Sequence, residues 1–140
     1  MDTIIEAIRQ YILTCPFLAN GLVNVDFLGS KPTEYSIDIL PCNPIIKKYI
    51  DGGSLRQYMF AFTSKEYYSS GEMQNIENSG FYEKFASWIE KNNLKNILPI
   101  LGDKKYSQEI EIQSSGYLFD NDGTNARYQI QLRLIYSQEV

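Results

Sequence analysis

The N-terminal segment has apolar residues at helical spacing. Thr3 and Glu6 fit a capping box, in which the side chain of each residue satisfies a backbone N–H of the first turn. Pro16 is expected to end this helix, because the residue before a proline avoids helical conformations. We therefore predict an amphipathic helix at the N-terminus. The residues expected on its apolar face are Ile4, Ile5, Ile8, Tyr11 and Ile12.

Alternation of apolar and polar residues then predicts strands. Residues 23–28 and 35–41 alternate in this way, with a turn signal of glycine and proline at 29–32 between them. Residues 46–50 predict a short strand or an extended arm. The sequence Asp-Gly-Gly-Ser at 51–54 is a strong turn signal, because glycine and aspartate favour tight turns.

Residues 55–68 predict one long strand with apolar side chains on both faces. Tyr58, Phe60 and Phe62 lie on one face of this strand. The opposite face carries Leu55, Met59 and Ala61. Two apolar faces are typical of a central strand, or of a strand that meets another subunit.

The next segment predicts helices. Residues 72–76 favour a short helix, and a second helix is expected to open at Ser79–Gly80 and to end at Asn92–Asn93. The loop that follows, residues 94–105, contains apolar anchors. The second helix has its apolar stripe at Phe81, Phe85, Trp88 and Ile89.

The C-terminal part predicts a β-hairpin. Residues 106–119 form the first strand and residues 127–136 the return strand. The order of elements predicts a single α+β domain over residues 1–140, with a mainly antiparallel sheet and two principal helices packed on one face. The return strand is expected to face the core with Tyr128, Ile130, Leu132 and Leu134.

The tip of this hairpin, Asp-Asn-Asp-Gly at 120–123, has three interpretations. A calcium loop of the EF-hand type with Gly123 at its glycine position would place Leu118 at the first ligand and Gln129 at the bidentate glutamate. A catalytic pair of Asp120 and Asp122 would need burial or a neighbour that raises one pKa, and a solvated tip offers neither. A hairpin tip needs only residues that tolerate positive φ, so we favour it and expect no metal there.

Composition narrows the possible chemistry. The chain has no histidine, which excludes Ser-His-Asp and Cys-His nucleophiles and histidine-based zinc sites. Cys15 and Cys42 are distant in sequence and are expected to be free thiols in a reduced, intracellular protein. No cofactor is expected.

The charge and hydropathy of the chain indicate which kinds of partner to expect. The net charge is −4, and lysines occur at most in pairs, as at 47–48 and 104–105, so direct binding to nucleic acid is not expected. The N-terminus lacks the pattern of a signal peptide, and the apolar runs are too short for a membrane span. The 11 tyrosines suit half-buried strand faces and protein interfaces.

Carboxylates, lysines and tyrosines remain as candidate groups for an enzyme, and the candidate site residues are carboxylates. Glu109 and Glu111 are two residues apart on one strand face, and Asp38 and Glu66 lie on other predicted strands. One hypothesis is therefore a monomeric α+β binding module, or a minor enzyme with a carboxylate site. On an exposed strand face, such acidic pairs more often serve solubility.

The stretch "GYLFDNDGTNARYQIQLRLIY" resembles the C-terminal part of the small tail-terminator proteins of tailed bacteriophages, some of which are described as phage minor capsid proteins. The segments "MDTIIEAIRQYIL", "TEYSIDILP" and "FYEKFASWIEKNN" are similar in kind and order to the helix, strand and second helix of that family. The resemblance covers most of the chain as an order of elements with local patterns. It includes no catalytic motif.

The resemblance implies a non-enzymatic structural protein of the virion tail, assembled in the cytoplasm of a host bacterium. Such proteins form a hexameric ring that caps the tail tube, stops its polymerisation and joins it to the neck or connector proteins of the head. The expected partners are thus other copies of the chain, the tail tube protein and the neck proteins. The interface candidates are Arg56, Tyr58, Phe60, Phe62, Tyr67, Tyr68, Asp120, Asp122 and Arg127.

Overall fold

The computed structural model describes residues 3–18, 23–25, 34–67, 72–121 and 125–140. Within these ranges, only the backbone is described for residues 24, 34, 66–67, 72–79, 119–121 and 125–126. The elements, in chain order, are α1 (Ile4–Ile12), β1 (Val23–Val25), β2 (Glu34–Leu40), β3 (Ile45–Lys48), β4 (Ser54–Tyr67), α2 (Glu72–Leu94), β5 (Lys105–Ile112), β6 (Tyr117–Asn121) and β7 (Asn125–Gln138).

Two long strands form the centre of the seven-stranded sheet. β4 and β7, 14 residues each, pair in antiparallel fashion along their whole length, from Ser54 opposite Gln138 to Tyr67 opposite Asn125. β2 and β3 flank β4, and β5 and β6 flank β7, all antiparallel. β1 pairs in parallel with β2. The predicted long central strand at 55–68 is therefore confirmed.

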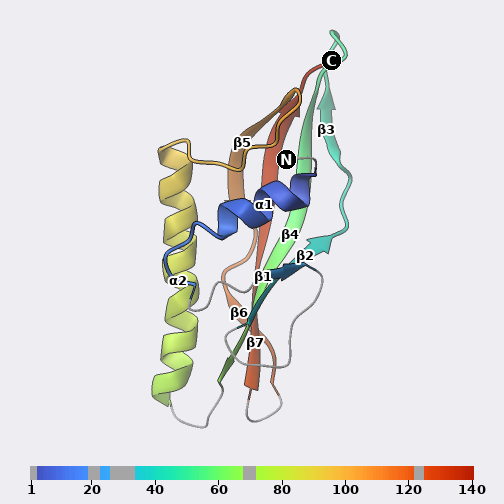
Figure 1. Cartoon of the computed structure of the whole chain (residues 1–140). Coiled ribbons are helices and arrows are strands. Elements are labelled where there is room, and N and C mark those ends of the chain that lie inside the picture. The colour runs from blue at the N-terminus through green and yellow to red at the C-terminus, as the bar shows by residue number, and fades with distance from the viewer. Residues whose placement is uncertain (1–2, 19–22, 26–33, 68–71, 122–124) are drawn as a thin grey trace.

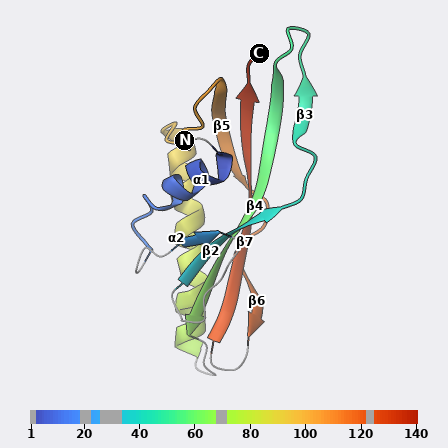
Figure 2. The same cartoon turned by 45° about the vertical axis from the view of Figure 1, so that its right-hand side comes forward.

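Both helices pack on the same face of the sheet, as Figures 1 and 2 show. The core lies between the helices and this helix-covered face. The predicted α+β class, with a mainly antiparallel sheet and helices on one face, is confirmed. All four predicted core residues of β7 are buried: Tyr128, Ile130, Leu132 and Leu134.

α1 forms as its sequence predicts. Thr3 caps the helix, and its Oγ1 accepts a hydrogen bond from the backbone N–H of Glu6 (3.3 Å). The helix ends at Ile12, before Pro16. The backbone N–H of Leu13 donates to the carbonyl of Arg9, and the Thr14 hydroxyl donates to the carbonyl of Tyr11 (2.6 Å).

The prediction of two separate helices in the next segment was wrong. α2 runs without a break through Gly80 and continues to Leu94, past the pair Asn92–Asn93. A methyl group at Gly80 would meet no atom within 4 Å, so this glycine faces open space and marks no turn. The two asparagines are tertiary anchors: Asn92 donates to the Tyr11 hydroxyl (3.2 Å), and Asn93 bonds the backbone of β5.

The predicted strand at 106–119 is divided. β5 and β6 pair with successive parts of β7, and residues 113–116 between them are not in a strand. There the backbone N–H groups of Gln113 and Ser114 both donate to the carbonyl of Gln131. Gly116 lies against Tyr82 of α2, and a methyl group at this glycine would be 2.3 Å from the Tyr82 Cβ. Contact with the helix thus interrupts the strand.

The two faces of β4 differ more than its sequence predicts. Phe60 and Phe62 are fully buried beneath the helices. On the other face, which we call the reverse face, Met59 lies opposite Arg133 of β7 and Ala61 lies opposite Gln131. No described helix packs on this reverse face. The apolar residues of β4 there are therefore interspersed with polar side chains from β7.

Candidate interaction surfaces

The turn between β3 and β4 is held rigidly. The predicted turn at 51–54 is present, with Gly52 at φ +93°. The backbone N–H of Tyr49 donates to the Gly53 carbonyl (2.8 Å), and that of Gly52 donates to the Tyr49 carbonyl (3.1 Å). The Asp51 carboxylate accepts from the Gly53 N–H (2.8 Å). Together, β3, this turn and the start of β4 form a stiff hairpin, residues 45–54, which we call the arm.

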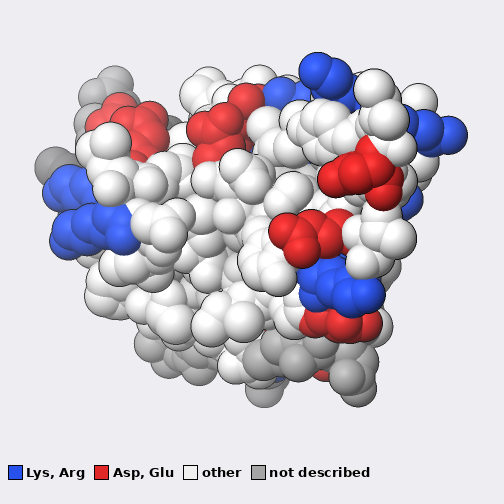
Figure 3. Space-filling view, turned by 90° about the horizontal axis from the view of Figure 1, so that it is seen from above, with Lys and Arg blue, Asp and Glu red and all other residues white. Residues whose placement is uncertain are grey.

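The arm presents apolar side chains at the end of the sheet. It extends past α1 in Figure 1, close to the C-terminus. Ile50 is fully exposed at its tip, and Ile46, Tyr49 and Val140 are exposed beside it. Figure 3, a view from this end, shows a broad uncharged area with charged side chains along its edges, most of them on the right. The arm itself also carries Lys47, Lys48 and Asp51. Exposed apolar groups that gather on a rigid element are typical of a protein contact surface.

The reverse face of the sheet carries a hydrogen-bonded polar network. Arg133 forms an ion pair with Glu111, and its Nη1 donates to the Gln57 side-chain oxygen (3.0 Å). Gln113 also donates to Glu111 (3.2 Å). Both members of the ion pair are partly exposed, so we expect the pair to contribute little to stability.

Among the described side chains, the carboxylates considered for an enzyme do not form one cluster, although Glu109 and Glu111 share the reverse face of β5. Asp38 accepts hydrogen bonds from Ser36 (2.7 Å) and Thr63 (2.9 Å), so both of its oxygens are engaged. Glu111 lies three strands away across the sheet, about 14 Å at the usual strand spacing. Glu109 is exposed on β5, and the side chain of Glu66 is not among the described ones. Among the described residues, no group of three or more acidic or cysteine side chains is placed to hold a metal ion.

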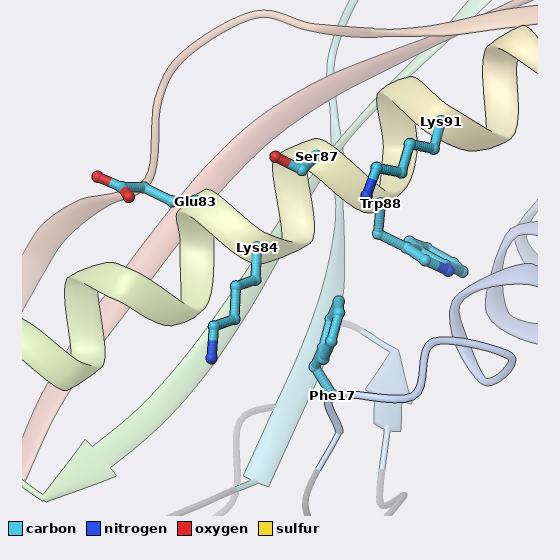
Figure 4. A pocket seen from close by; sticks show the side chains of 6 residues that line it. All are labelled: Phe17, Glu83, Lys84, Ser87, Trp88 and Lys91. Atoms are coloured by element: carbon cyan, nitrogen blue, oxygen red, sulfur yellow. The ribbon is translucent and has the colours of Figure 1, made fainter.

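A shallow hollow lies between α2 and the segment that follows α1 (Figure 4). Phe17 stands opposite Trp88, and the space between and around them is about 410 Å³. Lys84 and Lys91 extend from α2 on either side of Trp88, and Glu83 and Ser87 complete the lining. The hollow thus combines two aromatic rings with two cations and one carboxylate.

Two further hollows flank the loop after α2. One, of about 330 Å³, lies between this loop and α1 and is lined by Ala7, Tyr11 and residues 97–100 among others. The other, of about 580 Å³, lies between the loop and the start of β5. The predicted apolar anchors of this loop are Leu98 and Leu101, whereas Ile97 and Ile100 are exposed.

Burial shifts the pKa of three groups. Burial raises the pKa of Tyr11 to about 12, against the lowering effect of the hydrogen bond from Asn92. Burial also raises the pKa of Tyr136, and nearby Arg56 partly offsets this. Cys15 is buried, which raises its thiol pKa. Cys15 and Cys42 are both free, as predicted. All three shifts follow from packing rather than from a catalytic arrangement.

The predicted interface residues have different locations. Phe60 and Phe62 are buried in the core of the single chain, and Phe62 stacks on Phe85 of α2, so neither side chain is available at the surface. Arg56 and Tyr58 are half-buried on β4, and the Arg56 Nε donates to Ser54 (2.9 Å). Arg127 is exposed near the opposite end of the sheet.

The structure describes the remaining interface candidates only in part or not at all. Tyr67 and Asp120 lie at strand ends with only their backbones described, and Tyr68 and Asp122 lie outside the described residues. The predicted turn at 29–32 and half of the hairpin tip, residues 122–123, also lie outside the described residues.

Sequence reasoning missed several residues of these surfaces. The exposed arm tip at Tyr49–Ile50 had a signal, since two apolar residues directly precede a turn. Tyr82 belongs to the helical stripe by its spacing from Phe85 and Ile89 and is buried. No sequence signal could have shown that Phe17 and Trp88 line the same hollow, because the two residues are far apart in the chain and come together only in the fold.

No protein-family model and no curated protein matches the sequence. Among the described helices, none has the length and apolar character needed to cross a membrane.

Proposed function

We propose that this chain is a structural assembly protein that caps the tail tube of a phage or phage-derived particle as a ring. In this role it stops polymerisation of the tube and provides the joint to the neck. The order of elements agrees with the family resemblance: a capped N-terminal helix, antiparallel strands, a second helix on the same face and a closing set of strands. That agreement concerns the general plan of the fold.

The observation that carries the proposal is the arm. Its turn is fixed by three hydrogen bonds, and it projects Ile50 and Tyr49 away from the core. Burying an isoleucine side chain against a partner gains about 1.5–3 kcal/mol, and a rigid arm loses little conformational entropy on binding. An exposed apolar tip on a stiff hairpin is therefore suited to contact the tube, the neck or a neighbouring copy.

The arrangement of polar groups favours assembly over catalysis. Asp38 and Glu111 are each engaged by neighbours and lie three strands apart. The hollows are shallow and open, and a catalytic site normally needs convergent polar groups in a deeper pocket.

Particle assembly without the protein tests this proposal. Particles made in its absence should have tails of irregular length, or tails that never join heads, and supplying the wild-type chain should restore them. Ile50→Asp should fail to restore assembly while leaving the melting temperature within about 2 °C of wild type, because Ile50 contacts no core residue.

Leu118→Asp is the matched control, since Leu118 is an exposed apolar residue on β6, outside the arm. It should restore assembly as wild type does. Normal, joined tails in the absence of the chain would contradict the proposed function. Full restoration by Ile50→Asp would show that the arm is not the contact.

A further inference from the structure

The side chains that line the hollow on α2 are spaced so that the hollow could receive one aromatic side chain with an acidic neighbour. Lys84, Trp88 and Lys91 follow each other at four and three residues, so Trp88 lies about 6 Å along the helix from Lys84 and about 4.5 Å from Lys91. Phe17 closes the opposite wall and is itself exposed. An aromatic ring placed between Phe17 and Trp88 would have a cation within reach on either side.

The chain carries a complementary pair on the edge strand β5. Tyr106 is 52% exposed and lies opposite Ser137 of β7. Glu109 is exposed and lies opposite Ile135, two residues along β7 and on the same, reverse face of the sheet. Because a bulge between Ser107 and Glu109 shortens the separation, the two side chains are about 7 Å apart along the strand.

We propose that the hollow of one copy receives Tyr106 of a second copy, with Glu109 of that copy facing Lys84 or Lys91. The inference rests on the proposed ring and specifies its interface. The separation of Tyr106 and Glu109 is close to that of Trp88 and Lys84, so the strand edge and the helix match when laid alongside each other. Glu109 is opposite in charge to Lys84 and Lys91, which favours this register, and the carboxylate of Glu83 points away from Phe17 and Trp88 (Figure 4).

The location of the two surfaces makes the contact heterologous. The hollow lies in the helical layer, and Tyr106 and Glu109 lie on the reverse face of the sheet. A contact between two different surfaces leaves one of each free on every pair, so it repeats from copy to copy and closes into a ring when the rotation allows.

A charge exchange tests the contact. Wild type is assembled at rising concentration, alone and with purified tail tubes, and the assembled fraction is measured by sedimentation. Lys84→Glu combined with Lys91→Glu should raise the concentration for half-assembly by about tenfold or more, because like charges then face each other. Glu109→Lys should do the same. Joining all three substitutions in one chain should restore much of the assembly, because the charges are again opposite.

Lys95→Glu is the matched control, since Lys95 is exposed just beyond α2 and outside the hollow. It should leave assembly unchanged, and all variants should melt as wild type does because these side chains are exposed. Assembly of the double lysine variant at the wild-type concentration would overturn the inference. So would a loss that the triple variant does not regain, because Glu109 would then not be the group that faces the lysines. If wild type itself never assembles, even with tubes, the proposed function fails instead.

Discussion

At the scale of single residues, Tyr82 connects α2 to the centre of the sheet. Its hydroxyl donates to the carbonyl of Tyr128 (3.0 Å) and lies 2.6 Å from the Ser64 Oγ. All three residues are buried, so these hydrogen bonds satisfy polar groups that would otherwise be costly to bury. Gly116 packs directly on the Tyr82 side chain, and only a residue without a Cβ allows the chain between β5 and β6 to come this close.

Two glycine substitutions test this contact. Gly116→Ala places a methyl group within 3 Å of three Tyr82 atoms, and we expect a loss of about 1–3 kcal/mol in the free energy of unfolding. Gly80→Ala is the control, because its methyl group meets open space within a helix, and it should stabilise the protein by about 0.5–1 kcal/mol. Urea denaturation measures both. A neutral Gly116→Ala would show that the loop moves away freely.

Tyr11 should make the protein sensitive to alkaline pH. Its pKa of about 12 in the folded chain exceeds the ordinary value of 10.0, and burial is the main cause. Between these two pH values the unfolded chain loses the phenolic proton and the folded chain keeps it, so stability is complete below pH 10 and falls as the pH rises towards 12. The fall from this group is at most about 1.4 kcal/mol per pH unit.

Tyr11→Phe should flatten that part of the pH profile, because phenylalanine has no proton to lose. Denaturation midpoints measured between pH 9 and pH 12 provide the check. If stability fell with pH equally steeply in the variant and in wild type, other groups, such as Tyr136, would account for the loss of stability at alkaline pH.

At the scale of elements, periodicity predicted most helices and strands but not where they continue or break. The N-cap at Thr3, the strands β2 and β7 and the turn at Asp51–Gly52 have local sequence signals, and each of these features is present in the fold. The continuity of α2 through Gly80 and the break between β5 and β6 depend on packing against distant elements. A local pattern contains no information about such contacts.

The aromatic stripe of α2 should differ in energy along its length. Phe85 is fully buried and stacks on Phe62 at 4.7 Å between ring centroids, so Phe85→Ala should cost about 3–5 kcal/mol. Trp88 contacts Tyr11 and Phe85 but has one side towards the hollow, so Trp88→Ala should cost less, about 1–3 kcal/mol. Thermal and urea unfolding of both variants provide the comparison. A larger loss at Trp88 than at Phe85 would place the tryptophan in the core.

At the scale of the whole molecule, the sequence predicted the fold class, but it did not predict which aromatic side chains of the long strand are buried. The aromatic residues at 60 and 62 suggested a surface that a small core leaves uncovered, yet both are fully buried in the core beneath the helices. Exposed apolar groups lie on the arm, in the loop after α2 and on the edge strand β5, and also on β6 and in the segment after α1. Which strand edge or helix face remains uncovered depends on the topology, and spacing along the chain does not determine it.

The number of copies per particle tests the proposed ring most directly. The protein is quantified by mass spectrometry with labelled reference peptides in purified particles whose tails have been sorted by length. A closed cap at one end of the tube predicts a fixed number, six if the family resemblance holds, that does not depend on tail length. Absence of the chain from finished particles, or a copy number that rises in proportion to tail length, would contradict a capping ring.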